Sequence, residues 1–123
     1  MALKYTKEHE WVRVEGDVAV CGISAYAAEQ LGDIVYVELP NEGRAVKKDG
    51  EMAVVESAKA ASDVFAPISG TVLAVNPALG EKPELVNAGP EGEGWMVKLR
   101  IGNAGELDAL MDEAAYKEFL GGL

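Results

Sequence analysis

Residues 51–66 read EMAVVESAKAASDVFA, and this stretch decides the predicted fold. Two apolar, β-prone runs, 51–56 and 62–66, lie on either side of the segment Ser-Ala-Lys-Ala-Ala at 57–61. Apolar runs of this length, separated by so short a segment, are typical of paired strands. The pattern therefore predicts a hairpin with Lys59 at its tip, where small alanine neighbours leave the amine open from several directions.

Further short strands are predicted on both sides of this hairpin. Apolar and β-branched residues recur in runs bounded by Gly, Pro or Asp, which favours strands joined by turns. The predicted strands cover residues 11–14, 18–23, 33–39, 44–46, 70–75 and 95–101. Residues 76–94 hold three of the five prolines and four of the 14 glycines and are predicted to form a long ordered loop.

Two helices are predicted around these strands. Ser24 can cap a short alanine-rich helix at 25–31, and Gly32 follows where a left-handed residue would end it. Apolar residues spaced i, i+3, i+4, i+7 begin at Leu107 and predict an amphipathic C-terminal helix that continues to about Leu120. Many short strands with a terminal helix indicate a mainly β fold, a small sandwich or barrel with helical additions, in one domain of residues 1–123.

The composition excludes several classes of function. Eleven Lys and Arg against 21 Asp and Glu give the 123 residues a formal net charge of −10, which repels nucleic-acid backbones. No run approaches the roughly 20 apolar residues that a membrane helix needs. One cysteine and one histidine argue against an internal disulfide and a metal cage. The N-terminus shows no targeting pattern, which favours a bacterial-type cytoplasm.

Lys59 allows two interpretations on the residues alone. It is either a solvated turn lysine, as most lysines are, or the attachment site of a swinging prosthetic group. A tether of that kind needs an exposed tip and a rigid scaffold behind it, and the flanking runs predict both. A weak internal symmetry accompanies the second interpretation, because similar β units follow Gly43, 16 residues before Lys59, and Gly70, 11 residues after it.

The sequence also resembles a known family. Residues 55–63, VESAKAASD, resemble the lipoyl-attachment segment of the H-protein family of the glycine cleavage system. Four further segments are similar to that family in the same order and extend the resemblance over nearly the whole chain: residues 4–12, 31–40, 67–70, and 83–87 followed by 92–95. Five segments in order are far more specific than one lysine motif.

The resemblance implies a fold and a function. The fold would be a barrel-sandwich hybrid, as in lipoyl domains, with a C-terminal helix. Lys59 would carry lipoic acid in amide linkage, and the protein would be a non-catalytic carrier in glycine catabolism and one-carbon metabolism. It would take the aminomethyl group from the pyridoxal-phosphate-dependent glycine decarboxylase to the tetrahydrofolate-dependent aminomethyltransferase. Dihydrolipoamide dehydrogenase, with FAD and NAD, would reoxidise the dithiol.

The same resemblance implies roles for five further residues. Glu56 matches the acidic position that lipoyl-attaching enzymes read, and Gly43 and Gly70 match glycines that let the flanking turns form. Glu10 and Asp63 match a cleft whose carboxylates would hold the ammonium of the aminomethyl arm, although either could be an ordinary surface acid. 

Two cleft positions depart from the family pattern. The position of Glu8 can be a serine in the family, and that of Gln30 can be a histidine.

Other functions stay open at this point. The same Lys59 could make the chain a lipoyl or octanoyl donor for other lipoate-dependent enzymes. The chain could instead be the lipoyl domain of a 2-oxo acid dehydrogenase, although such domains are usually shorter and joined to flexible linkers. Biotin carriers flank their lysine with methionines, so Ala58 and Ala60 favour lipoate. A hydrolase using His9 with an acid such as Glu10 is the alternative from another class.

Overall fold

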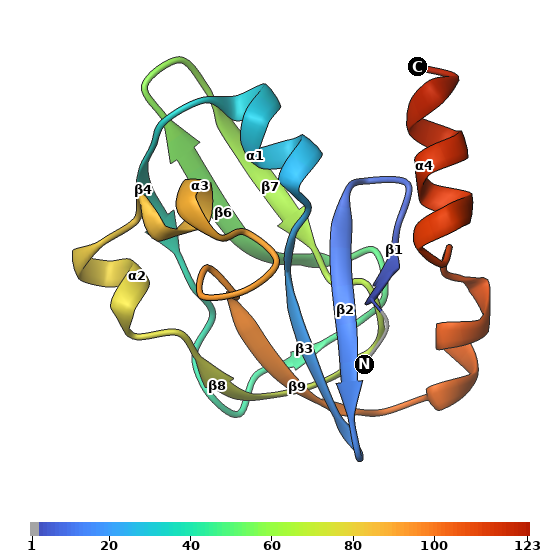
Figure 1. The fold of residues 1–123 in the computed structure, drawn as a ribbon. Helices are drawn as coiled ribbons and strands as arrows, with labels where there is room; N and C mark the ends of the chain where they lie inside the picture. Colours follow the sequence, from blue (N-terminus) through green and yellow to red (C-terminus); the bar gives the residue numbers. More distant parts are fainter. Residues whose placement is uncertain (1–2) are drawn as a thin grey trace.

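A computed structural model describes residues 3–123 and shows a mainly β architecture (Figure 1). Within the described residues, nine strands and five helices follow one another in uneven alternation. In order they are β1 (Leu3–Tyr5), β2 (Glu10–Glu15), β3 (Val18–Ile23), α1 (Ala25–Leu31), β4 (Ile34–Glu38), β5 (Ala45–Val46), β6 (Glu51–Ser57), β7 (Ala61–Phe65), β8 (Gly70–Val75), α2 (Ala78–Glu81), α3 (Leu85–Ala88), β9 (Val97–Ile101), the 3₁₀ helix η1 (Ala104–Ala109) and α4 (Glu113–Gly121).

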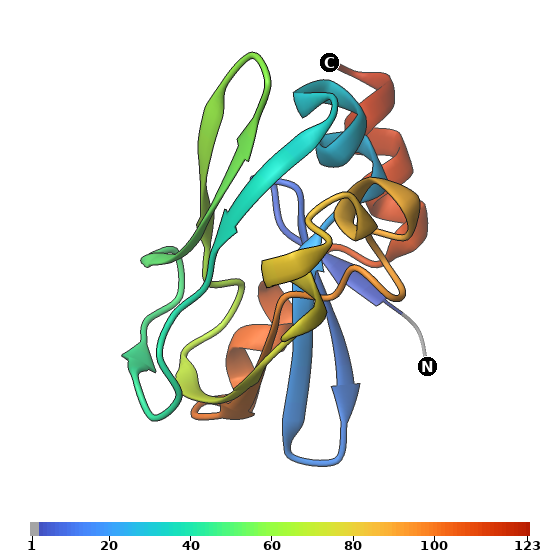
Figure 2. The same ribbon diagram turned by 90° about the vertical axis from the view of Figure 1, so that its left-hand side faces the viewer.

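The strands form two sheets that pack face to face. The larger has the order β1-β2-β3-β9-β8-β5, and the smaller has the order β4-β6-β7. Figure 2 shows the β4-β6-β7 layer set apart from the β2-β3 hairpin. The core lies between them, where Val12, Cys21 and Leu99 of the larger sheet and Val55 of the smaller are fully buried. The two sheets do not close into one barrel. The predicted mainly β fold, a small sandwich or barrel with helical additions, is confirmed and takes the form of two packed sheets.

The hairpin and the first helix form where the sequence predicts them. β6 and β7 pair in antiparallel register from Glu51↔Phe65 to Glu56↔Ala61. Ser24 caps α1 by accepting a hydrogen bond from the backbone N–H of Ala27.

The structure corrects the prediction for residues 76–94. They contain two short helices, α2 and α3, rather than a loop alone. The side chain of Asn76 organises this segment, because it accepts from Ala78 N–H and donates to the carbonyl oxygens of Glu93 and Trp95. Short one-turn helices of this kind carry no periodic signal that a sequence pattern could reveal.

The predicted start of the C-terminal helix is wrong. One helix from Leu107 was expected, but η1 ends at Ala109 and α4 begins only at Glu113. Met111 lies between them and pairs with Tyr5 in a two-way backbone bridge, with N···O distances of 2.7 and 2.9 Å. Asp112 then caps α4 by accepting from Ala115 N–H. Tertiary pairing therefore overrides the local apolar spacing.

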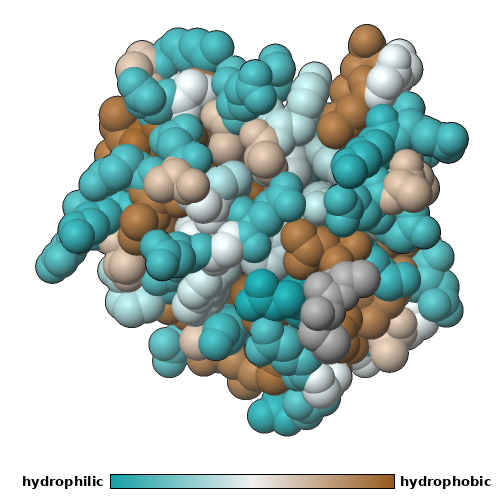
Figure 3. Space-filling view, in the orientation of Figure 1, coloured by the Kyte–Doolittle hydropathy of each residue, from teal (hydrophilic) through white to brown (hydrophobic). Residues whose placement is uncertain are grey.

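Smaller differences concern strand ends and the surface. β1 was not predicted, β4 is shorter than the expected 33–39, and β9 begins at Val97 rather than 95. Hydrophilic side chains cover most of the face seen in Figure 3. Within residues 3–123, no helix has both the length and the apolar character needed to cross a membrane.

Candidate functional site

The tip of the β6–β7 hairpin holds Lys59 on a fixed backbone. Ser57 N–H donates to Ala60 O at 2.7 Å, which closes the hairpin. The Ser57 hydroxyl oxygen accepts from the N–H groups of Lys59 and Ala60, at 3.3 and 3.1 Å. No role was predicted for Ser57, although a serine before a tight turn is a known signal for hydrogen bonds of this kind.

The side chain of Lys59 is exposed and lies close to the end of α1. Its Cε would be 3.8 Å from a Cβ at Gly32, the residue that caps α1. The four ion pairs found within residues 3–123 do not include Lys59. Its amine is therefore presented to solvent beside the α1–β4 connection.

Glu56 and the two predicted glycines surround the hairpin in different ways. Glu56 is half-buried on β6, opposite Tyr36 on one side and Ala61 on the other. Gly43 has a left-handed φ of 88° with open space around it. Gly70 lies at the start of β8, where a Cβ would overlap the carbonyl oxygen of Arg100. Glycine is thus required at 43 by backbone conformation and at 70 by close strand packing.

A cavity of about 460 Å³ lies between α1, β7 and the turn that precedes β2. The cavity extends toward the hairpin tip: of its lining residues, Leu31 is next to Gly32 and Ala61 is two residues after Lys59. The structure brings Glu10 and Asp63 together on its wall, with Glu8 and Gln30 also present. 

Glu10 lies deep in this wall. Its side chain accepts from the Thr6 hydroxyl at 2.6 Å and from the N–H of Phe65 at 3.2 Å, and the residue is only 3% exposed. Burial raises the pKa of Glu10 to about 7, against the opposing effect of these two hydrogen bonds. Glu10 is therefore a buried carboxyl group that changes charge near neutral pH, not an ordinary surface acid.

Asp63 lies on the same cavity but at its exposed edge. It belongs to β7, opposite Val54, and its side chain is open to solvent. The cavity thus has one carboxyl group at depth and one at the rim.

His9 connects the cavity wall to the C-terminal helix. Its backbone is left-handed, with φ 69°, and its Nδ1 lies 2.8 Å from the Tyr116 hydroxyl on α4. That hydroxyl lies 2.7 Å from Ser24 Oγ, and Ser24 is fully buried. Burial lowers the pKa of His9, which favours its neutral form. A His–Tyr–Ser chain that ends inside the core gives His9 a structural role. His9 Nδ1 contacts Tyr116, and the Glu10 oxygens accept from Thr6 and Phe65, so the geometry does not support a hydrolase that uses His9 with Glu10.

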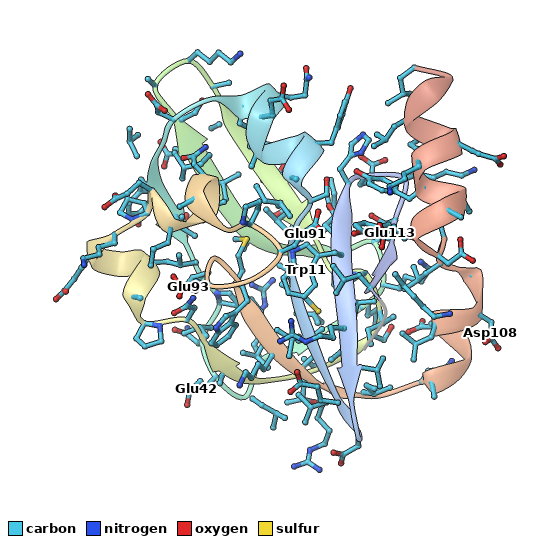
Figure 4. All side chains as sticks on the ribbon, viewed as in Figure 1. Trp11, Glu42, Glu91, Glu93, Asp108 and Glu113 are labelled. Carbon is cyan, nitrogen blue, oxygen red and sulfur yellow. The ribbon has the colours of Figure 1, made fainter. Side chains whose placement is uncertain are left out.

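The loop from α3 to β9 fixes the other end of α1. Glu91 accepts from the Tyr5 hydroxyl at 2.9 Å and from Ala25 N–H at 2.8 Å. Trp11 Nε1 donates to Pro90 O at 2.8 Å, and Figure 4 shows Trp11 next to Glu91. These contacts hold α1, one wall of the cavity, against the larger sheet.

Comparison with known proteins agrees with this geometry. The family model described as glycine cleavage H-protein matches residues 3–122. The glycine cleavage system H protein of Xanthobacter autotrophicus is 61% identical over 97% of this chain and 95% of its own length. The H protein of Thermotoga maritima is 57% identical over 94% of both chains. The crystal structure of the H protein from Mycobacterium marinum has a TM-score of 0.88 and 34% identity, covering 99% of this chain and 98% of that one.

These matches favour the glycine cleavage family over a lipoyl domain of a 2-oxo acid dehydrogenase, and they extend the five similar segments to full-length similarity. They also account for the two packed sheets with a C-terminal helix. The chain belongs to the glycine cleavage H-protein family.

Proposed function

We propose that residues 1–123 form the lipoyl carrier of the glycine cleavage system, with lipoic acid attached to Lys59. The observation that carries this proposal is an exposed lysine, on a rigid hairpin tip, beside a cavity that contains a buried carboxyl group. The protein would act as a carrier and not as a catalyst.

The residues at the tip fit an attached group. Attachment joins Lys59 Nζ to the carboxyl carbon of an activated lipoyl or octanoyl group, and the activating group leaves as the amine loses a proton. Ala58, Ala60 and Lys59 are all exposed, so an attaching enzyme can approach the amine. The attaching enzyme would recognise Glu56, which lies three residues before Lys59. When bound, lipoic acid supplies a dithiolane that can accept the aminomethyl group of glycine.

The cavity residues would shield the cargo. A cationic amine entering the cavity would meet Asp63 at the rim and Glu10 at depth, and a charge-assisted hydrogen bond to either carboxylate would retain it. The buried side of the cavity, formed by Glu10, Ile23, Val55 and Val64, would limit access of water to a labile carbon–sulfur bond. This division of work leaves the chemical steps to the glycine decarboxylase, the aminomethyltransferase and dihydrolipoamide dehydrogenase.

A reconstituted glycine cleavage assay with these three enzymes tests the proposal. Lys59→Arg keeps the positive charge, but its guanidinium cannot form the amide, so activity should fall to background while the circular dichroism spectrum is unchanged. Lys47→Arg is the control, because Lys47 is also exposed but lies outside the tip, and it should keep wild-type activity. Glycine cleavage retained by Lys59→Arg would overturn the proposal.

A further inference from the structure

The side chain of Asn87, on α3, holds the backbone on which the lysine-bearing tip rests. Asn87 Nδ2 donates to Gly32 O, and its Oδ1 accepts from Ile34 N–H, both at 2.8 Å. The segment between these two contacts joins α1 to β4: Gly32 has a left-handed φ of 83°, and Asp33 lies at a bend before β4 begins at Ile34. Asn87 therefore holds this connection by hydrogen bonds to the residues on both sides of Asp33.

The residue between these two positions faces the hairpin. Asp33 O accepts from Ala58 N–H at 3.2 Å, and Ala58 is the residue before Lys59. Lys59 Cε also lies near this segment, 3.8 Å from the place that a Cβ at Gly32 would occupy.

We propose that Asn87 is a positioning residue for Lys59, which it reaches through the Gly32–Ile34 backbone and the Asp33–Ala58 hydrogen bond. This inference rests on the proposed attachment of an acyl group at Lys59. Loss of the Asn87 amide leaves Gly32 O and Ile34 N–H without their partner and frees the Asp33 carbonyl to turn. The tip then samples more orientations, and the attaching enzyme meets a less pre-organised amine.

The chain offers a matched control in Asn76. Its side chain also holds a loop through amide bonds, to Glu93 O, Trp95 O and Ala78 N, and it is almost fully buried. None of these contacts involves residues 32–34 or the hairpin tip. Asn76→Ala should therefore lower the Tm at least as much as Asn87→Ala without changing the tip.

The test compares acylation of Lys59 in the full chain by a lipoate–protein ligase supplied with ATP and octanoate. The ligase forms octanoyl adenylate, and Lys59 Nζ displaces AMP from it. Asn87→Ala should lower kcat/KM for the protein substrate about tenfold, since loss of alignment at a reacting group has effects of this size or larger. Asn87→Asp keeps an acceptor for Ile34 N–H but loses the donor to Gly32 O, so its kcat/KM should lie between the values of the wild type and of Asn87→Ala. The ligase should acylate Asn76→Ala at the wild-type rate.

Amide hydrogen exchange supplies a readout that does not depend on any enzyme. The Ala58 N–H should exchange about tenfold faster in Asn87→Ala and at the wild-type rate in Asn76→Ala. Equal acylation and equal Ala58 exchange in the two alanine variants would overturn the positioning role. Failure of the wild-type chain to be acylated would instead overturn the proposed function, whatever the exchange data show.

Discussion

The hairpin tip and the deep end of the cavity differ in almost every physical respect. At the tip, Lys59 and its alanine neighbours are exposed, and hydrogen bonds among backbone groups and Ser57 hold the turn. At the deep end, Glu10 is buried and its two oxygens accept from groups on separate segments, Thr6 and Phe65. The tip is accessible to a partner protein, whereas Glu10 at the deep end is almost completely shielded from solvent.

This difference explains how one small chain could load and protect a group. A tip held by local bonds tolerates an approaching enzyme, because nothing in the core depends on its solvent-facing side chains. A buried carboxyl group costs stability when charged, but it binds a cation more strongly than an exposed one does.

The largest effect on stability is expected at Gly70, where the backbone of the neighbouring strand leaves no room for a Cβ. In Gly70→Ala the new Cβ would overlap Arg100 O, so unfolding free energy should fall by about 4 kcal/mol, measured by urea denaturation. Gly43→Ala adds a Cβ in open space and costs only its left-handed φ, about 1 kcal/mol. Equal losses in the two variants would show that strand packing does not set the requirement at residue 70.

A slightly smaller effect should appear in the pH dependence of stability. The folded pKa of Glu10, about 7, lies above its ordinary 4.5, so the folded chain binds this proton more tightly than the unfolded chain. The resulting stabilisation is complete below about pH 4.5 and is lost as pH rises through 7. Its size is about 3 kcal/mol.

Substitution separates this contribution from the rest. Glu10→Gln cannot titrate, so this fall in unfolding free energy between pH 5 and 8 should disappear. Asp63→Asn removes the exposed carboxylate of the same cavity and should leave the fall in place. If Glu10→Gln kept the full fall in unfolding free energy, titratable groups other than Glu10 would be responsible for it.

The smallest effect is expected at the tip. Ser57→Ala removes the acceptor for Lys59 N–H and Ala60 N–H, both exposed to water, so stability should fall by only about 1 kcal/mol. Exchange of the Ala60 amide should nevertheless accelerate clearly. Ser62→Ala, which loses one long bond of 3.4 Å, is the control and should change neither. A global loss as large as that of Gly70→Ala would mean that the tip belongs to the core after all.

Local patterns predicted the parts of the fold that local bonds determine. The β6–β7 hairpin and the Ser24 cap follow from neighbouring residues, and both were found. The start of α4 was mispredicted because Met111 pairs with Tyr5, far away in sequence. The burial of Glu10 could not be predicted either, because it depends on β7 placing the Phe65 N–H beside the Glu10 carboxyl group.

The candidate site shows the same division. Lys59 could be singled out from its flanking runs, whereas Asn87 acquires its contacts only when α3 packs beside the start of β4. Sequence reasoning therefore singles out the exposed candidate, Lys59, but misses residues whose contacts form only in the folded chain.

Mass spectrometry of the intact chain, followed by peptide mapping, would show whether Lys59 is the attachment site. The chain would be produced in cells supplied with lipoate, beside a control lipoyl domain. We expect a mass increase of one lipoyl or octanoyl group, located on Lys59. An unmodified Lys59 in cells that modify the control domain would contradict it.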